Sequence, residues 1–223
     1  MKNKKIFIAC DTKSIKKVKK IIKATQTNKI KIGYKFGLEF FNSKNGRKFI
    51  SKLKNKIIFI DLKLHDIPNT MKSAVSALKD LNIDYLTVHI SSGLKALKEV
   101  KKVSGKIKIV GVTTLTSLDN KNLKEIGYSK SIKNLVIQQS KLARKANLDC
   151  LVVSPHEVKF VKKIFKREII TPGIRLNSNI NDQKRVMTPE QAFNNGSDWI
   201  VAGRTITKGN IKNNLKKLIN NIS

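Results

Sequence analysis

Short runs of β-branched and aromatic residues alternate along the whole chain with longer amphipathic stretches, and this rhythm constrains the fold more than any other feature. Alternating strand and helix patterns are typical of repeated β-α units around a parallel sheet. Eight such runs occur, and eight parallel strands can close into a barrel. We expect strands at Lys5–Cys10, Lys29–Gly33, Lys56–Leu62, Tyr85–His89, Lys106–Val112, Cys150–Ser154, Glu168–Thr171 and Trp199–Gly203. The sequence therefore predicts a single (β/α)8 TIM barrel, an α/β fold, as one domain over residues 1–223.

The stretches between these runs predict helices, and two of them carry clear start signals. Ser154-Pro155 and Thr188-Pro189 each combine a hydroxyl cap with a proline at the first helical position. A doubly wound sheet is the alternative α/β architecture, but Asp11-Thr12-Lys13 after the first strand lacks the glycines of a dinucleotide-binding turn. The expected helices include Ser14–Ala24, Thr70–Leu81, Leu94–Val103, Ile132–Ala146 and Ile211–Ile219.

The chain is strongly basic, with 47 Lys and Arg against 15 Asp and Glu and a formal net charge of +32. A basic surface attracts the phosphates of nucleic acids and membranes. Here, however, lysines dominate and are spread over nearly every segment, whereas nucleic-acid binders more often concentrate arginine and aromatic residues on one face. We interpret the charge as compositional bias and expect no specific nucleic-acid partner, although a positive field would help to capture an anionic substrate.

The N-terminus and the cysteines both predict a cytoplasmic protein. The apolar run after the basic first residues ends at Asp11, which is too short for a signal peptide or a membrane span. Cys10 and Cys150 have no second cysteine or histidine at metal-ligand spacing, so we expect reduced core thiols.

The end of the expected third strand carries the candidate chemistry. Asp61 and Lys63 are two residues apart, so in a strand they share a face, and at a barrel strand's end that face points into the mouth. Pro68 favours an extended Ile67, which puts Asp66 on a loop. Neighbouring carboxylates favour a protonated Lys63, which suits it to donate a proton. The alternative is a salt-bridge cluster that only fixes the barrel, but buried ion pairs are seldom retained for stability alone.

The stretch Asp61–Thr70, Asp-Leu-Lys-Leu-His-Asp-Ile-Pro-Asn-Thr, resembles the signature of the orotidine 5′-phosphate decarboxylases, which catalyse the last step of UMP synthesis. Each further similar segment is a modest signal, but together and in order they cover essentially the whole chain. These segments are Asp11, Lys31–Gly33, Val88–His89, Val112–Ser117, Thr171–Arg175, Asp182–Gln191 and Gly203–Arg204.

The resemblance implies a mechanism without metal or organic cofactor. CO2 leaves C6 of the pyrimidine, and Lys63 protonates the carbanion that remains. Asp61 would lie beside the departing carboxylate, while Lys31 and Asp66 would complete an alternating Lys-Asp-Lys-Asp array. The resemblance also implies a homodimer in which Asp66 and Thr70 reach into the partner's site.

The resemblance further implies which residues hold the substrate. Asp11 would bond the ribose, and the fork of Arg204 suits phosphate oxygens. Residues 176–183 would form a lid. Lys35 is expected to be a surface lysine, and Ser154 has the alternative role of a helix cap. The implied substrate-binding residues are Asp11, Lys31, Asp61, Lys63, Asp66, Ile67, Thr70, Thr116, Ser154, Pro172, Arg175, Gln183, Gly203 and Arg204.

Three rival functions remain open at this point. A metal-dependent decarboxylase of the same superfamily, acting on a sugar phosphate such as 3-keto-L-gulonate 6-phosphate, would share the Asp-x-Lys-x-x-Asp core. The continuation Ile67–Thr70 and the segment around Gln183 argue against it. The others are a basic nucleic-acid-binding module and a barrel that has lost its activity.

Overall fold

The chain folds as a closed barrel of eight parallel strands, in a computed structural model that describes residues 4–176 and 187–222. Each strand pairs with the next along the chain, and the last strand pairs with the first. The predicted TIM barrel is therefore confirmed. The strands are β1 (Lys5–Ala9), β2 (Lys31–Gly37), β3 (Ile57–Leu64), β4 (Tyr85–His89), β5 (Lys108–Val112), β6 (Cys150–Val152), β7 (Glu168–Thr171) and β8 (Trp199–Ala202).

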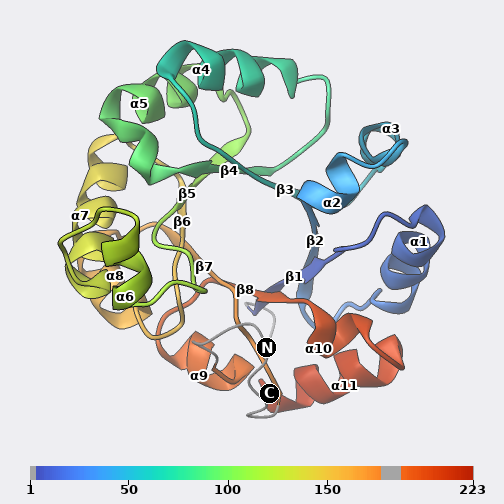
Figure 1. The fold of residues 1–223 in the computed structure, drawn as a ribbon. Coiled ribbons are helices and arrows are strands. Elements are labelled where there is room, and N and C mark those ends of the chain that lie inside the picture. The colour runs from blue at the N-terminus through green and yellow to red at the C-terminus, as the bar shows by residue number, and fades with distance from the viewer. Residues whose placement is uncertain (1–3, 177–186, 223) are drawn as a thin grey trace.

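Helices form an outer ring around the strands (Figure 1). Their apolar faces pack on the outward-facing residues of the strands, for example Val18 and Ile21 against the cluster that contains Ile6 and Ile8. The described residues contain no helix that is both long enough and apolar enough to cross a membrane. The helices are α1 (Ile15–Ala24), α2 (Leu38–Phe41), α3 (Gly46–Ser51), α4 (Pro68–Ala77), the 3-10 turn η1 (Ile90–Ser92), α5 (Gly93–Val103), α6 (Asn120–Glu125), α7 (Ile132–Lys145), α8 (Val158–Ile164), α9 (Pro189–Asn194), α10 (Arg204–Thr207) and α11 (Ile211–Asn221).

The largest difference from the predicted strands lies in β2, which runs to Gly37 rather than ending at Gly33. Gly33 does not make a turn. A Cβ at this position would lie 2.6 Å from the ring of Phe7, so glycine is required for close packing inside the barrel. The extension has a functional consequence, because it moves the end of β2 four residues along the chain.

One of the two predicted helix starts is wrong. The helix after β6 begins at Val158, and Ser154 does not cap it; instead the Ser154 backbone N–H donates to the Glu157 carboxylate at 3.1 Å. Thr188 does cap α9, and its hydroxyl and the Gln191 side chain form the reciprocal pair of a capping box. Both sequences carry the same signal, but only the second is followed at once by helical residues.

A layer of aromatic side chains fills the barrel interior. The rings of Phe7 and Trp199 stack with centroids 4.0 Å apart, and Phe59 and Tyr85 pack around them at an angle. All four residues are buried and belong to one cluster inside the barrel. This layer separates the two ends of the barrel, so that each end can carry its own polar groups.

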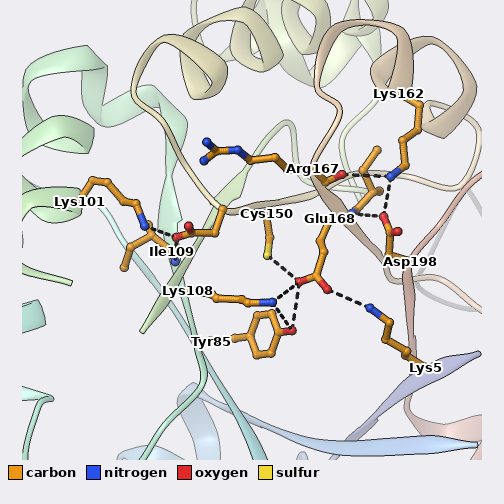
Figure 2. Close-up of polar contacts among 12 residues, drawn as sticks. Lys5, Tyr85, Lys101, Lys108, Ile109, Cys150, Lys162, Arg167, Glu168 and Asp198 are labelled. Atoms are coloured by element: carbon orange, nitrogen blue, oxygen red, sulfur yellow. Dashed lines mark hydrogen bonds and ion pairs between the residues drawn. The ribbon is translucent and has the colours of Figure 1, made fainter. Parts of the chain in front are cut away.

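Three aspartates in the described chain fasten the N-terminal ends of neighbouring strands together. Each lies directly before a strand, and its carboxylate accepts a hydrogen bond of 2.8 Å from a backbone N–H of the preceding strand. Figure 2 includes two of these contacts. The pairs are Asp84 with Ile58, Asp149 with Ile109 and Asp198 with Ile169. Much of the chain's small acidic content therefore stabilises the barrel rather than the candidate site.

Candidate active site

A cavity of about 450 Å³ lies at the C-terminal ends of the strands. Its lining comes from β1, β2, β3, β5, β6, β7 and β8 or from the loops that follow them. The volume is typical of small-ligand sites, and catalytic groups of TIM barrels occupy this end. Of the residues expected from the sequence, the lining includes Asp11, Asp61, Lys63, Thr116, Pro172, Arg175, Gly203 and Arg204.

Alternating charges from three strand ends meet in this cavity. The Asp61 carboxylate lies between two ammonium groups, with Lys63 Nζ 2.9 Å from Oδ1 and Lys35 Nζ 3.3 Å from Oδ2. Lys35 Nζ is also 3.2 Å from an oxygen of Asp11. We call Asp11, Lys35, Asp61 and Lys63 the mouth array. Both lysines line the cavity, and Lys63 is the more exposed of the two, with 34% of its side chain accessible against 11% for Lys35.

Two members of the mouth array, Asp61 and Lys35, are held in their charged forms by their neighbours. Burial alone would raise the pKa of Asp61, but the adjacent Lys35 and Lys63 ammoniums outweigh it and lower that pKa. Burial would likewise lower the pKa of Lys35, yet Asp61 and Asp11 raise it above its usual value. Asp61 is therefore an ionised carboxylate and Lys35 a protonated ammonium at neutral pH.

The backbone at Lys63 adopts a left-handed conformation, with φ at 52°. The β3–β4 pairing is interrupted between Ile60 and Leu64, which is a bulge that turns the end of β3. A left-handed backbone is unfavourable for a residue with a long side chain and persists only where surrounding contacts enforce it. Such strained residues concentrate at functional sites.

The opposite side of the cavity carries groups suited to an anion. Arg204 begins α10 directly after Gly203, and both line the cavity together with Arg175. A Cβ at Gly203 would meet only Ala9, at 3.7 Å, so the absence of a side chain there leaves room on the cavity side. Thr205 donates its hydroxyl to the Ile174 carbonyl at 3.1 Å, which ties this turn to the end of β7.

The comparisons with known proteins agree with this geometry. The family model described as "Orotidine 5'-phosphate decarboxylase / HUMPS family" matches residues 4–217. The chain belongs to this family.

Curated relatives and a solved structure are named orotidine 5′-phosphate decarboxylase. An orotidine 5′-phosphate decarboxylase of Wolbachia sp. subsp. Brugia malayi is 44% identical over 96% of this chain and 96% of its own length. One from Prochlorococcus marinus (strain MIT 9215) is 42% identical over 92% of this chain and 89% of its own. The crystal structure of orotidine 5′-phosphate decarboxylase from Lactobacillus acidophilus superposes with a TM-score of 0.84 at 28% identity, covering 99% of both chains.

The sequence-based choice of Lys31 for the charged array of this decarboxylase family is wrong, and so is the expectation that Lys35 is a surface lysine. Lys31 is the first residue of β2, is exposed, and pairs in register with Lys5 at the opposite end of the barrel. Lys35 lies four residues, or about 13 Å, further along the same strand and reaches Asp61. The chain contains two Lys-apolar-Gly triplets, 31–33 and 35–37, and only the second reaches the mouth.

Several other expected residues lie outside the cavity lining. Asp66, Ile67 and Thr70 are exposed on the β3–α4 connection and the start of α4, and Ile67 is 67% exposed. Gln183, with residues 177–183 of the expected lid, lies outside the residues that the structure describes. Ser154 is fully buried beside the lining residue Val153, and its hydroxyl has no hydrogen-bond partner among the described residues.

His89 lies near the mouth array but is suited to a neutral role. Burial lowers the pKa of His89, and the neighbouring His65 and Lys63 lower it further. The rings of His65 and His89 lie 5.2 Å apart, and His65 Nε2 is 3.5 Å from the Ser91 hydroxyl. The two histidines therefore pack against each other beside the mouth array.

Proposed function

We propose that this chain converts orotidine 5′-monophosphate to UMP and CO2, with Lys63 as the proton donor. The single observation that carries the proposal is the Lys63 ammonium held 2.9 Å from the half-buried, ionised Asp61 inside a nucleotide-sized cavity. A carbanion that forms next to a fixed ammonium is stabilised without reorganisation of the protein. The curated relatives bear the name of this activity.

The bond changes balance with the groups of the mouth array alone. The C6–carboxylate bond breaks, CO2 departs, and the electron pair of that bond remains on C6. Lys63 then transfers one ammonium proton to C6, which yields UMP and leaves Lys63 as a neutral amine that takes up a proton from solvent. Asp61 and Lys35 keep their charges throughout, so their role is to orient Lys63 and to set the field at the reacting carbon.

The remaining contacts to the nucleotide are also proposals. Asp11 would accept from the ribose, Ser154 would offer its unpartnered buried hydroxyl to the pyrimidine, and Arg204 and Arg175 would bind the phosphate. Phosphate is remote from the breaking bond. Its binding energy therefore acts by fixing the ring against the mouth array rather than by direct chemistry.

We further propose a homodimer in which Asp66 and Thr70 complete the partner's site. Their exposure on the rim, outside the cavity lining of their own chain, supports this arrangement. Mixing inactive Lys63→Ala and Asp66→Ala protomers under exchange conditions tests it. Mixed dimers would contain one intact site, so activity should recover to about one quarter of that of the wild type; no recovery would contradict sharing.

The metal-dependent sugar-phosphate decarboxylase is the remaining rival, and a chelator separates the two functions. We expect the purified protein to decrease the absorbance of orotidine 5′-monophosphate at the same rate with and without EDTA. Loss of the rate with EDTA, and its return on adding a divalent metal, would favour the rival. No absorbance change under either condition would overturn the proposed function. As an enzyme of nucleotide synthesis, the protein is inferred to act in the cytoplasm, which cell fractionation would test.

A further inference from the structure

Thr87, in the middle of β4, contacts two members of the mouth array without touching the cavity. Its side chain is fully buried, and it is not among the residues that line the site. Its Oγ1 accepts a hydrogen bond from the Lys63 backbone N–H at 2.8 Å. The same hydroxyl donates to Asp61 Oδ1 at 3.1 Å.

These contacts occur where the sheet is interrupted. The backbone pairing between β3 and β4 lapses between Ile60 and Leu64, and Lys63 lies within that gap. The Thr87 hydroxyl therefore accepts a hydrogen bond from the Lys63 N–H at a point where the regular β3–β4 pairing is interrupted. Because the backbone of Lys63 is left-handed at φ 52°, a buried acceptor fixed on the neighbouring strand is the kind of contact that holds such a conformation.

The three groups close a ring of hydrogen bonds. Lys63 Nζ donates to Asp61 Oδ1, Thr87 Oγ1 donates to that same oxygen, and Thr87 Oγ1 accepts from the Lys63 backbone. A hydroxyl has one proton to donate, so bonding to Asp61 commits it and leaves its lone pairs for the Lys63 N–H. Thr87 therefore positions both ends of Lys63: it binds the backbone N–H directly and the ammonium through Asp61.

We propose that Thr87 is the positioning residue of the proton transfer: its hydroxyl holds the strained Lys63 backbone and the Asp61 carboxylate in register, so that the ammonium points at the reacting carbon. The inference rests on the proposed function. Because Thr87 does not itself line the cavity, it acts through Lys63 and should affect the rate of the chemical step and leave substrate binding unchanged.

The test compares Thr87→Val, which keeps the shape and removes the hydroxyl, with Thr87→Ser, which keeps the hydroxyl. With orotidine 5′-monophosphate, Thr87→Val should lower kcat by about 10- to 100-fold while KM stays within about twofold, since misplacing a reacting group by about 1 Å can cost about 100-fold. Thr87→Ser should restore kcat to within a few fold of the wild type. Should Thr87→Val fail to fold, Thr87→Ala carries the same expectation.

Thr25→Val is the matched control. Thr25 is also fully buried, and its hydroxyl is also hydrogen-bonded in a region remote from the mouth. It contacts the Ile21 carbonyl at 2.8 Å, the Tyr34 hydroxyl at 3.1 Å and the Ile22 carbonyl at 3.5 Å. It should lower the melting temperature by as much as Thr87→Val does, yet leave kcat unchanged. A purely structural Thr87 would behave as Thr25 does.

A double variant examines whether Thr87 acts through the lysine. In a Lys63→Ala background, Thr87→Val should produce no further loss of kcat, because the group that it positions is gone. A full additional 10-fold loss would overturn the inference, as would a Thr87→Val enzyme with wild-type kcat. Both results require an active wild type; an inactive wild type would overturn the proposed function, and this inference with it.

Discussion

The two ends of the barrel carry the same charge pattern in different settings. At the mouth, Asp61 lies between Lys35 and Lys63. At the base, Glu168 lies between Lys5 and Lys108, with both nitrogens 2.9 Å from its oxygens. The carboxylate between two ammoniums is therefore not, by itself, what distinguishes the candidate active site.

The base cluster consists of Lys5, Tyr85, Lys108, Cys150 and Glu168 (Figure 2). The Glu168 carboxylate also accepts from the Tyr85 hydroxyl at 3.1 Å and from the Cys150 thiol at 3.4 Å. Burial would raise the pKa of Glu168, but hydrogen bonds from Lys108 and Lys5 outweigh it and lower that pKa to about 2. Glu168 thus uses its acceptor capacity on residues from four other strands and links the base of the barrel together.

Access and backbone strain separate the two ends. The mouth array lines the cavity, whereas the aromatic layer around Phe7 and Trp199 lies between the cavity and the base cluster. Among the described residues, the non-glycine positions with positive φ are Asn55, Asn147 and Lys63. Asparagine tolerates this conformation, but lysine rarely adopts it. Similar ion pairs therefore link strands at one end and, at the other, lie on an open face beside a strained lysine, where we propose that they support chemistry.

Among substitutions that leave Lys63 in place, replacing the central carboxylate of the mouth should have the largest effect on catalysis. Asp61→Asn leaves Lys35 and Lys63 facing each other without the anion between them, so Lys63 loses its orientation. We expect kcat to fall by about 10³-fold, measured from the absorbance of orotidine 5′-monophosphate. If Asp61→Asn changed only the melting temperature, the mouth array would be as purely structural as the base cluster, which would contradict the proposed difference between the two ends.

Lys35 and Lys31 provide a matched pair on the same strand. Lys35→Ala removes the ammonium that bridges Asp11 and Asp61 and should lower kcat by about 10²-fold. Lys31→Ala removes an exposed lysine at the other end of β2 and should leave kcat and KM unchanged. If steady-state kinetics instead showed a large loss of kcat for Lys31→Ala and none for Lys35→Ala, the sequence-based choice of Lys31 for the charged array would be restored.

At the base, removing the charge should affect stability and spare activity. Glu168→Gln leaves two lysines without their carboxylate, which we expect to cost about 2 kcal/mol, less than for a fully buried pair because Lys108 is 46% exposed. Denaturant unfolding measures this cost. The folded variant should keep the kcat of the wild type, and a loss of kcat comparable with that of Asp61→Asn would break the comparison.

The smallest effect is a pH dependence of stability at the base. Because the pKa of Glu168 falls from 4.5 in the unfolded chain to about 2 in the folded protein, its contribution is complete above about pH 4.5. It is lost as the pH falls toward 2, where the folded carboxyl takes up its proton. The difference in melting temperature between the wild type and Glu168→Gln should therefore shrink over this interval, and a constant difference would show that the charge of Glu168 is not what stabilises the base.

The sequence predicted the parts of the molecule that depend on local periodicity. Alternating patterns were sufficient for the barrel, with β4 and β7 correct to the residue. Two-residue spacing predicted that Asp61 and Lys63 lie together, and they do, although the strand is irregular at Lys63. Lys35 was missed because Gly33 resembles a strand end. The actual role of Gly33 is to make room for the Phe7 ring of the neighbouring strand β1.

Contacts that depend on tertiary geometry could not be predicted from local sequence patterns. The bonds of Thr87 to the third strand arise from a bulge, and no spacing rule signals where the β3–β4 register breaks. The base cluster joins residues up to 163 positions apart, such as Lys5 and Glu168, and appears only when the barrel closes. The aromatic residues Tyr34 and Phe36 on either side of Lys35 are the sequence signal that could have extended β2 past Gly33.

The most direct test of the central claim is the turnover of Lys63→Ala with orotidine 5′-monophosphate beside the wild type. Without the ammonium there is no proton donor at the end of β3, so kcat should fall by several orders of magnitude while binding of UMP remains detectable by calorimetry. A variant that decarboxylates orotidine 5′-monophosphate at nearly the wild-type rate would contradict the role of Lys63 and the distinction between the two ends of the barrel.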